Sequence, residues 1–385
     1  MKQVCALAGK QSKLVLGLMS GTSADGVDAA LVRIEGCGLT SKIDVVAHTT
    51  APYPDRLRER VLALGDADSG EICRLNFTLG EFFAAAGRRL VLEAGFELSD
   101  LDLVGSHGQT VRHVPRRPGE TASTLQIGEA DVIAERLATP VVADFRTRDI
   151  AAGGEGAPLS AYVDYLLFRG SRPPPALLNL GGIANVTVLG ETIEEVFAFD
   201  TGPANMPLDE AVRILTEGKE QFDREGRLAA RGKVDANLLA RLLEHPYLKL
   251  RLPKTTGRET FGRRFVDPLL RGKGSQSGVD ILATLTLFVA RSIRAAFEDF
   301  VARRSAPAGL LVSGGGVHNL TLMRHLKKLF APLPVRTLDD AGFDPDAKEA
   351  MIFAVLANET IHGRPNNVPG ATGARWPTVL GKVSP

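Results

Sequence analysis

Short apolar runs broken by glycine, asparagine and proline dominate the middle of this chain. Residues 176–180 form one run, residues 183–189 form the next, and residues 196–199 form a third that ends at Asp200. Such runs are too short for helices and rich in β-branched residues, so they predict a hairpin followed by a strand. Asp200 is then expected at the mouth of the sheet, where a fixed carboxylate suits the general base of a kinase.

The turn of this hairpin contains Gly181 and Gly182, and Asn185 follows in the returning run. Glycine lets a backbone turn come close to a ligand, and the N–H groups of such a turn can face an anion. We therefore expect this turn to contact a phosphate.

A similar hairpin is predicted near the N-terminus. Residues 14–19 form a buried-strand run, residues 20–26 supply hydroxyl and amide donors and an Asp-Gly turn, and residues 27–34 return. A plain surface hairpin is the alternative for this segment alone. Because the two hairpins lie roughly half a chain apart, they favour a duplicated fold.

Polar residues follow two further predicted strands. After residues 101–105 come His107 and Gln109, which could bind sugar hydroxyls; a purely structural histidine is the alternative. After residues 140–143 comes the glycine-rich, charged segment 144–158, which is too long and too charged for a simple linker.

Two arginines in this segment are candidates for substrate binding. The guanidinium groups of Arg146 and Arg148 could each bind a substrate carboxylate. Alternatively they pair with Asp144 and Asp149 to hold the loop, and we expect one of the two arginines to do so.

The second half of the chain adds two more candidate ligand contacts. A polar helical insertion near residues 220–255 precedes a glycine-containing loop, in which Arg258 could contact a phosphate or a sugar. A strand at 309–312 leads through three consecutive glycines into a helix at 320–329. Such a junction can hold a nucleotide phosphate, since no side chain blocks its approach to the helix N-terminus. The three glycines are Gly314, Gly315 and Gly316.

Length and charge narrow the class of protein. At 385 residues the chain is expected to form two domains. Its 46 Lys and Arg nearly balance its 45 Asp and Glu, so neither nucleic acid nor an acidic membrane surface is an expected partner. Three scattered cysteines and the lack of a long apolar run predict a cytoplasmic protein without disulfides or a membrane span.

No Walker A motif and no helix-opening GxGxxG motif occurs, so phosphate binding is expected from the paired hairpins. Two hairpins and a glycine-rich turn, spread over two halves, are typical of the actin, hexokinase and heat-shock ATPase fold. We therefore predict an α/β protein of two ribonuclease H-like domains around an interdomain cleft that holds ATP. The N-terminal domain is expected at residues 1–145, completed by 346–385, and the C-terminal domain at 146–345.

Several motifs together resemble the anhydro-N-acetylmuramic acid kinases. They are GLMSGTSADGVD at 17–28, GSHGQT at 105–110, DFRTRD at 144–149, NLGGIANVT at 179–187 and FDTGP at 199–203. The resemblance implies an enzyme of peptidoglycan recycling that uses ATP and Mg²⁺. Its substrate would be 1,6-anhydro-N-acetylmuramic acid and its product N-acetylmuramic acid 6-phosphate.

The resemblance also implies roles for single residues. Asp200 would activate the water that attacks C1, with Glu349 assisting, and Arg148, with His107, would hold the sugar. The ATP phosphates would be lined by one segment, consisting of Gly21, Thr22, Ser23, Ala24, Asp25, Gly26, Val27 and Asp28. Mg²⁺ would stay on the ATP phosphates, with Asp25 and Asp28 as candidate ligands and a turn-forming role for Asp25 as the alternative. A homodimer is what the family suggests.

The chain departs from the family pattern at Ala204, where glycine is usual, and at Pro207. These departures bear on substrate specificity more than on the chemistry, because Asp200 remains. Two other functions stay open at this point. One is a kinase of another 1,6-anhydrosugar such as levoglucosan, and the other is a non-catalytic nucleotide- or sugar-binding module, which the presence of Asp200 disfavours.

Overall fold

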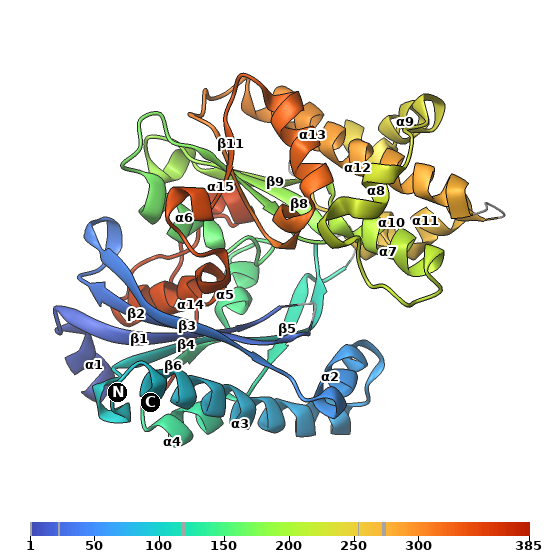
Figure 1. Cartoon of the computed structure of the whole chain (residues 1–385). Coiled ribbons are helices and arrows are strands. Elements are labelled where there is room, and N and C mark those ends of the chain that lie inside the picture. Colours follow the sequence, from blue (N-terminus) through green and yellow to red (C-terminus); the bar gives the residue numbers. More distant parts are fainter. Residues whose placement is uncertain (1, 22–23, 117–119, 253, 272–274) are drawn as a thin grey trace. The chain divides into compact units, whose positions relative to one another are not determined.

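The computed structural model describes residues 2–21, 24–116, 120–252, 254–271 and 275–385. The chain divides into two compact units, unit 1 with Met1–Leu167 and Phe343–Pro385, and unit 2 with Phe168–Gly342 (Figure 1). The first division comes later than the expected residue 145. Helix α6 (Ser160–Phe168) explains this, since it is tied to α14 (Pro345–Ile361) of unit 1. Tyr162 donates to Glu359 at 3.0 Å, and Lys348 forms an ion pair with Asp164 at 2.6 Å.

Unit 1 is built on a mixed sheet in the order β12-β6-β4-β1-β2-β3, with β5 paired to β4. Strands β1, β2 and β3 pair antiparallel, whereas β4 runs parallel to β1 and β6 runs parallel to β4. The strands are β1 (Ser12–Ser20), β2 (Gly26–Glu35), β3 (Lys42–Pro52), β4 (Leu103–Val114), β5 (Ser123–Ile127), β6 (Val141–Ala143) and β12 (Lys382–Ser384). The other helices are α1 (Lys2–Ala8), α2 (Asp55–Leu62), α3 (Ser69–Glu93), α4 (Ala130–Leu137), α5 (Phe145–Ala151) and α15 (Pro369–Thr372).

Two glycines allow α14 to lie directly on this sheet. Gly17 of β1 is paired with Gly105 of β4. A Cβ on Gly17 would lie 1.9 Å from the carbonyl oxygen of Ala350, and a Cβ on Gly105 would lie 2.0 Å from that of Phe353. Neighbouring residues in a strand point to opposite faces, so Leu16 packs on the other side, against α3. Helices α14 and α3 therefore cover opposite faces of the sheet.

Unit 2 repeats this strand order in a five-stranded sheet, β11-β10-β7-β8-β9. In both units an antiparallel hairpin and a third antiparallel strand lie on one side of the first strand, and parallel strands lie on the other. This is the predicted duplicated α/β fold. The strands are β7 (Ala176–Leu180), β8 (Ile183–Val188), β9 (Phe197–Pro203), β10 (Leu310–Ser313) and β11 (Val335–Thr337). The helices are α7 (Asn205–Leu215), α8 (Arg227–Arg231), α9 (Ala236–Leu243), α10 (Arg258–Phe261), α11 (Arg263–Leu270), α12 (Ser275–Ala296) and α13 (Leu320–Phe330).

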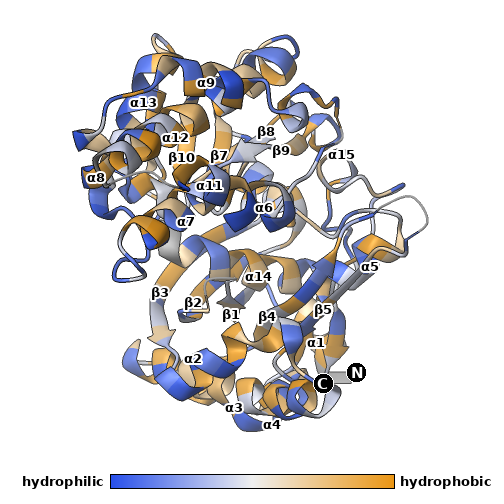
Figure 2. Ribbon diagram, turned by 90° about the vertical axis from the view of Figure 1, so that its right-hand side faces the viewer, coloured by the Kyte–Doolittle hydropathy of each residue, from blue (hydrophilic) through white to orange (hydrophobic). Residues whose placement is uncertain are grey.

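One apolar core joins the unit 2 sheet to its helices. Leu178, Phe199, Leu285 and Phe288 all belong to this core and are at most 5% exposed. Figure 2 shows α12 mainly in the hydrophobic colours, as expected of a helix that packs into this core.

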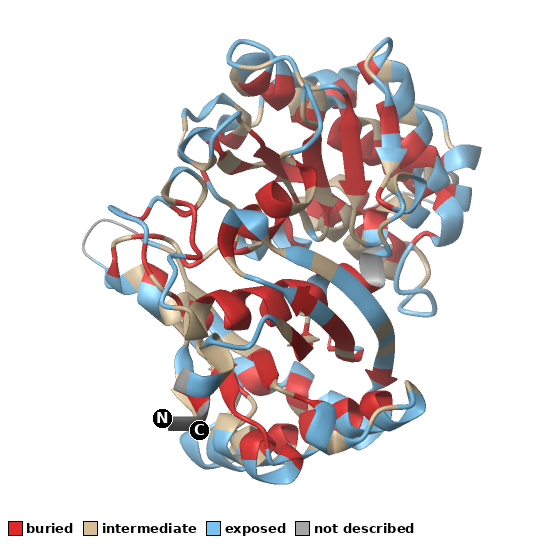
Figure 3. Cartoon of the chain, turned by 90° about the vertical axis from the view of Figure 1, so that its left-hand side faces the viewer, coloured by how far each residue is buried: buried red, intermediate tan, exposed pale blue. Residues whose placement is uncertain are grey.

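Three segments differ from the pattern-based prediction. Strand β3 was not expected, because most of its residues are exposed and its apolar positions do not alternate cleanly (Figure 3). The segment 144–158, expected to be a loop, contains helix α5. The expected helical insertion near 220–255 is broken into the short helices α8 and α9 with turns between them.

Candidate active site

A row of polar residues crosses the unit 2 sheet. Ser313 of β10 is paired with Asn179 of β7, Asn179 with Asn185 of β8, and Asn185 with Asp200 of β9. Paired residues project from the same face of a sheet, and all four are half-buried. Asn185 and Asp200 were expected as site residues, whereas Asn179 and Ser313 were missed. Only the pairing register reveals these two, and register cannot be read from single runs.

Asp200 is held tightly by one segment of chain. Its Oδ2 accepts hydrogen bonds from the Thr255 hydroxyl at 2.8 Å and from the Thr256 N–H at 3.0 Å. Its backbone N–H donates to the Lys254 carbonyl at 3.3 Å, and its own carbonyl accepts from the Tyr247 hydroxyl at 2.8 Å. Side chain and backbone are thus both fixed, which a positioned base requires.

The pKa of Asp200 reflects opposing influences. Burial raises it above its ordinary value, because a charged carboxylate loses hydration there. The hydrogen bonds from Thr256 and Thr255 and the charge of Lys254 lower it, and the charge of Glu259 raises it further. The net result is a raised pKa. This makes the carboxylate a better proton acceptor than a carboxylate in water.

The glycine turns of unit 2 lie beside the polar row. The carbonyls of Gly181 and Gly182 accept hydrogen bonds from the first N–H groups of α7, and Asn205 donates from its side chain to the Leu180 carbonyl at 2.8 Å. Gly314 has φ +81°, and a Cβ there would lie 2.5 Å from Asn179 Oδ1. The turn after β10 therefore requires glycine for its conformation and for its packing.

The other two glycines of this run differ in exposure. Gly316 is buried, and a Cβ there would lie 2.5 Å from Leu180 Cβ, whereas Gly315 is exposed. Both belong to a short 3-10 turn, Gly315–His318, which lies between β10 and α13. The glycines therefore do not lead directly into the helix N-terminus, as the sequence had suggested.

In unit 1, the expected phosphate loop follows β1. Gly21 accepts from the Ala24 N–H at 3.2 Å, and Ala24 has a positive φ of 53°. A Cβ on Gly26 would lie 2.2 Å from the Ala51 carbonyl, so β3 packs closely there. Val27 is fully buried in the unit 1 core, which leaves only its backbone available to a ligand. Thr22 and Ser23 lie outside the described residues.

The two candidate metal ligands have different surroundings. Asp25 is exposed and forms an ion pair with Arg58 at 3.2 Å. Asp28 is half-buried in β2 and accepts from the Thr50 hydroxyl at 2.6 Å. No group of three or more metal-binding side chains occurs within residues 2–21, 24–116, 120–252, 254–271 and 275–385.

Gln109 fixes the start of the unit 1 loop. It is 2% exposed, and its amide nitrogen donates to the Gly21 carbonyl at 3.2 Å. Ser20 Oγ lies 2.7 Å from both Gln109 Oε1 and the Gly26 carbonyl, and it accepts from the Tyr53 hydroxyl at 2.9 Å. Within the protein, Gln109 therefore has a positioning role.

The buried His107 and the half-buried Arg146 form a pair. Arg146 donates from Nε to His107 Nε2 at 2.9 Å and from Nη1 to the Gly156 carbonyl at 2.7 Å. His107 Nδ1 lies 2.9 Å from the Gly108 carbonyl, so the proton resides on Nδ1 and the ring is neutral. Burial lowers the pKa of His107 well below its ordinary value, helped by the charge of Arg146. Burial also lowers the pKa of Arg146 to about 10.

The expected pairing of Arg146 or Arg148 with a nearby aspartate was wrong. Asp149 is buried and accepts from the Gly156 N–H, Asn367 and Thr372, while Asp144 pairs with Lys382 at 2.6 Å. Asp149 is therefore held by neutral donors, and the cation that pairs with Asp144 comes from β12.

Arg148 and Glu349 are both exposed. Arg148 lies in the last turn of α5, and its guanidinium has no hydrogen bond or ion pair among the described residues. Glu349 lies near the start of α14, and its charge opposes the lowered pKa of Arg146. Arg148 is thus available to a ligand carboxylate.

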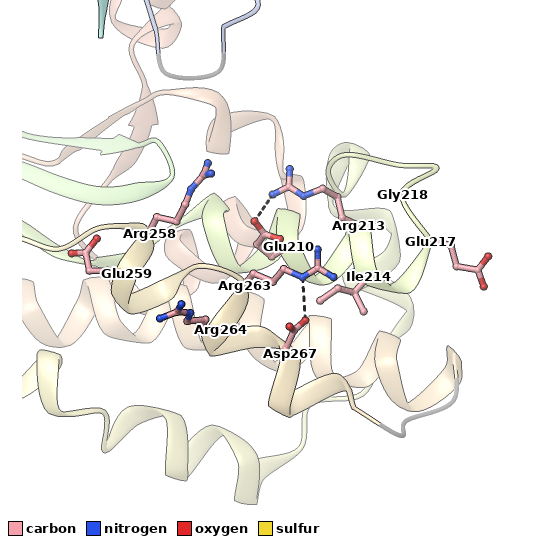
Figure 4. A pocket seen from close by; sticks show the side chains of 10 residues that line it. All are labelled: Glu210, Arg213, Ile214, Glu217, Gly218, Arg258, Glu259, Arg263, Arg264 and Asp267. Atoms are coloured by element: carbon pink, nitrogen blue, oxygen red, sulfur yellow. Dashed lines mark ion pairs between the residues drawn. The ribbon is translucent and has the colours of Figure 1, made fainter. Parts of the chain in front are cut away.

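Arg258 lines a pocket of about 1030 Å³ in unit 2. It follows by two residues Thr256, whose N–H donates to the Asp200 carboxylate. Figure 4 shows its side chain with those of nine neighbours from α7, α10 and α11 and their connections. Arg213 pairs with Glu210 at 3.0 Å and Arg263 with Asp267 at 3.5 Å. Arg258 has no such ion pair among the described residues.

In the described part of the chain, no helix is long and apolar enough to cross a membrane.

The family model and the sequence relatives that match this chain share one description. A family model described as anhydro-N-acetylmuramic acid kinase matches residues 13–385. The anhydro-N-acetylmuramic acid kinase of Caldanaerobacter subterraneus subsp. tengcongensis is 47% identical, covering 100% of both chains. That of Salinibacter ruber is 45% identical, covering 100% of this chain and 99% of the relative. The structure of (R)-2-hydroxyglutaryl-CoA dehydratase component A from Acidaminococcus fermentans aligns over 91% of this chain and 99% of its own, with 12% identity and a TM-score of 0.43. This last likeness is too weak to bear on function.

Proposed function

This chain belongs to the anhydro-N-acetylmuramic acid kinase family, and from this premise we propose which of its residues carry out the reaction. The enzyme is an ATP-dependent phosphotransferase of peptidoglycan recycling. It opens the 1,6-anhydro bridge of 1,6-anhydro-N-acetylmuramic acid hydrolytically and phosphorylates O6. The products are N-acetylmuramic acid 6-phosphate and ADP.

The reaction needs a base because water is a poor nucleophile near neutral pH. The water oxygen forms a bond to C1 as the bond from C1 to O6 breaks, and the base takes a proton from the water. The electron pair released to O6 then attacks the γ-phosphorus of ATP, and ADP leaves. Since the leaving oxygen becomes the phosphoryl acceptor, base and phosphates must be held in a fixed arrangement.

Asp200 is the base in this proposal. The observation that carries it is the fixed, half-buried carboxylate within β9, whose Oδ2 is held by Thr255 and Thr256. Burial raises its pKa, which strengthens it as a proton acceptor. Glu349, exposed near the start of α14, is proposed as an assistant.

The sugar contacts are assigned to side chains by their exposure and by their hydrogen bonds and ion pairs within the protein. Arg148 is proposed to bind the lactyl carboxylate, because its exposed guanidinium has no ion pair within the described part of the chain. His107, with both ring nitrogens engaged, supports this region by orienting Arg146. Gln109 positions the loop after β1, and Arg258 is proposed as a further sugar or phosphate contact.

The nucleotide contacts are proposed for backbone groups. In unit 1 they come from the segment 21–28, with its glycines and the turn at Ala24. In unit 2 they come from the turns after β7 and β10 and from Asn185. The residues of these turns are Gly181, Gly182, Gly314, Gly315 and Gly316.

Three proposals rest mainly on the family. Mg²⁺ would keep most of its waters and neutralise charge on the ATP phosphates, which needs few protein ligands. Asp25 and Asp28 supply carboxylate oxygens of the kind it prefers; Arg58 pairs with Asp25, and the Thr50 hydroxyl donates to Asp28. The enzyme is proposed to act in the cytoplasm, where its ATP is available, and as a homodimer. Sedimentation of the full chain tests the dimer.

An assay with three sugars tests the function. The purified enzyme is given ATP and 1,6-anhydro-N-acetylmuramic acid, levoglucosan or free N-acetylmuramic acid, and phosphate transfer to each is measured. We expect turnover of the anhydromuramate alone. Preference for levoglucosan would keep the kinase chemistry and remove the recycling role, whereas ATP binding without any phosphorylated sugar would favour a binding module.

A further inference from the structure

Lys254 is a buried lysine next to the proposed base, and the reaction as described does not use it. The residue is 6% exposed, and its Nζ has no hydrogen-bond partner among the described residues. The ring centroids of Tyr247 and Phe300 each lie 5.1 Å from Nζ. An ammonium group without a hydrogen-bonded acceptor is costly to bury, and two aromatic faces recover part of that cost.

The groups around Lys254 are the same ones that hold Asp200. The Lys254 carbonyl accepts from the Asp200 N–H at 3.3 Å, and the next two residues bind the Asp200 carboxylate. Tyr247 donates its hydroxyl to the Asp200 carbonyl while its ring faces the ammonium. Phe300 packs edge-on against Phe199, the residue before Asp200, at 5.4 Å. Lys254 and Asp200 are therefore held in place by the same hydrogen bonds and aromatic residues.

We infer that Lys254 is a positioning residue for the proposed base, whose charge keeps the Asp200 carboxylate ionised and ready to accept a proton. The inference rests on the proposed role of Asp200. In a site with little water, a fixed positive charge favours the charged form of a nearby carboxylate. Burying the Lys254 ammonium lowers the stability of the fold, and its charge keeps the Asp200 carboxylate ionised.

The other charged groups around the pair act in both directions. For Asp200, burial and the charge of Glu259 raise the pKa, and the donors Thr256 and Thr255 and the charge of Lys254 lower it. For Lys254, burial lowers the pKa, and the charges of Asp299 and Asp200 raise it. Without the lysine charge, only the hydrogen bonds from Thr255 and Thr256 oppose the increase in the Asp200 pKa that burial and Glu259 cause. The pKa of Asp200 should then rise further.

The pH dependence of kcat/KM tests this inference. In Lys254→Met, which keeps the chain length and removes the charge, the acid limb should move to higher pH by roughly 0.5 to 1 unit. Activity should fall about three- to tenfold below the limb and much less above it. Lys254→Arg, which restores the charge, should move the limb back. The matched control is Lys249→Met, at an exposed lysine paired with Glu244, and it should leave the limb in place.

Thermal stability separates this role from a structural one. Lys254→Met removes an unpaired buried charge, so its Tm should equal or exceed that of the wild type. A lower Tm with the same loss of activity at every pH would overturn the inference, as would an unmoved acid limb. Should the variant be too slow to assay, infrared difference spectra against Asp200→Asn give the titration of the Asp200 carboxyl directly, with the same expected upward shift.

Asp200→Asn distinguishes failure of the inference from failure of the proposed function. If Asp200→Asn is inactive and Lys254→Met keeps the wild-type acid limb, only the role of Lys254 is lost. If Asp200→Asn remains active, Asp200 is not the base, and the inference falls with it.

Discussion

The two units share a strand order but place their glycines differently. In unit 1, Gly17 and Gly105 lie inside neighbouring central strands, where α14 packs against their backbone. In unit 2, the matching strands Ala176–Leu180 and Leu310–Ser313 contain no glycine, and the glycines follow the strands instead. The same topology thus uses glycine for helix packing in one unit and for the turns beside a polar row in the other.

The third strands of the two units differ as well. Strand β9 of unit 2 carries Asp200, which two threonines hold. Strand β3, at the same place in the unit 1 sheet, is largely exposed and ends at Pro52 without a comparable acid. Strand order alone therefore does not decide where polar and acidic side chains lie, and the residues that occupy each strand do.

The close packing of α14 on the unit 1 sheet can be tested by adding one methyl group. Gly105→Ala would place a Cβ 2.0 Å from the Phe353 carbonyl oxygen, so α14 must shift or the strand must bend. We expect a loss of about 3 kcal/mol or more in the unfolding free energy of unit 1. The single tryptophan, Trp376, belongs to unit 1 and reports the transition by its fluorescence during urea unfolding.

The control for this substitution is Gly170→Ala in unit 2. A Cβ there would meet nothing within 4 Å, so its effect should stay within about 0.5 kcal/mol. Equal stability of Gly105→Ala and the wild type would refute the close packing of α14 on the sheet.

The ligand-binding role proposed for unit 1 is tested by Arg148→Ala. Loss of a charge-assisted hydrogen bond to a substrate carboxylate should raise KM for the anhydromuramate about 10- to 100-fold, with a smaller effect on kcat. Steady-state kinetics measure both constants. Arg88→Ala removes another exposed arginine of unit 1 that has no ion pair among the described residues, and it should leave KM unchanged. If the two variants behave alike, Arg148 does not bind the substrate.

A smaller effect is expected at Asp209 of α7, in unit 2. Burial raises its pKa from 3.8 to about 7, with the charge of Arg213 opposing. Its protonated form therefore stabilises the folded state fully below pH 3.8, and this contribution is lost as the pH rises to about 7. Asp209→Asn does not lose it. The variant should gain about 1 to 4 kcal/mol relative to the wild type between about pH 4 and about pH 8.

Urea unfolding followed by circular dichroism at the two pH values measures this gain. Asp339→Asn, at an exposed aspartate of unit 2, is the matched control, and its unfolding free energy should stay within about 0.5 kcal/mol of the wild type. A constant difference between Asp209→Asn and the wild type at all pH values would show that Asp209 titrates normally.

Sequence patterns predicted the central strands of both sheets because their apolar runs are short, buried and bounded by glycine or proline. Strand β3 escaped because an edge strand exposes one face and gives no clear alternation. Helix α5 escaped because it is seven residues long, and its N-cap, Asp144, has φ 57° and makes no capping hydrogen bond.

The candidate site was predictable in part, for similar reasons. One run of sequence predicts a strand that ends at Asp200, but β9 continues to Pro203, so Asp200 lies within the strand and not at its end. Contacts between distant segments do not follow from such runs. The pair of His107 and Arg146, the polar row that adds Asn179 and Ser313, and the buried ammonium of Lys254 all depend on register or on loop paths.

The assignment of Asp200 as the base is tested most directly by Asp200→Ala with and without formate. We predict that kcat falls about 10²- to 10⁴-fold, while ATP affinity and Tm stay near those of the wild type. Added formate should restore part of the rate, because a small carboxylate can take the proton from water in the space left by the side chain. A kcat within tenfold of the wild type, without any response to formate, would contradict the assignment.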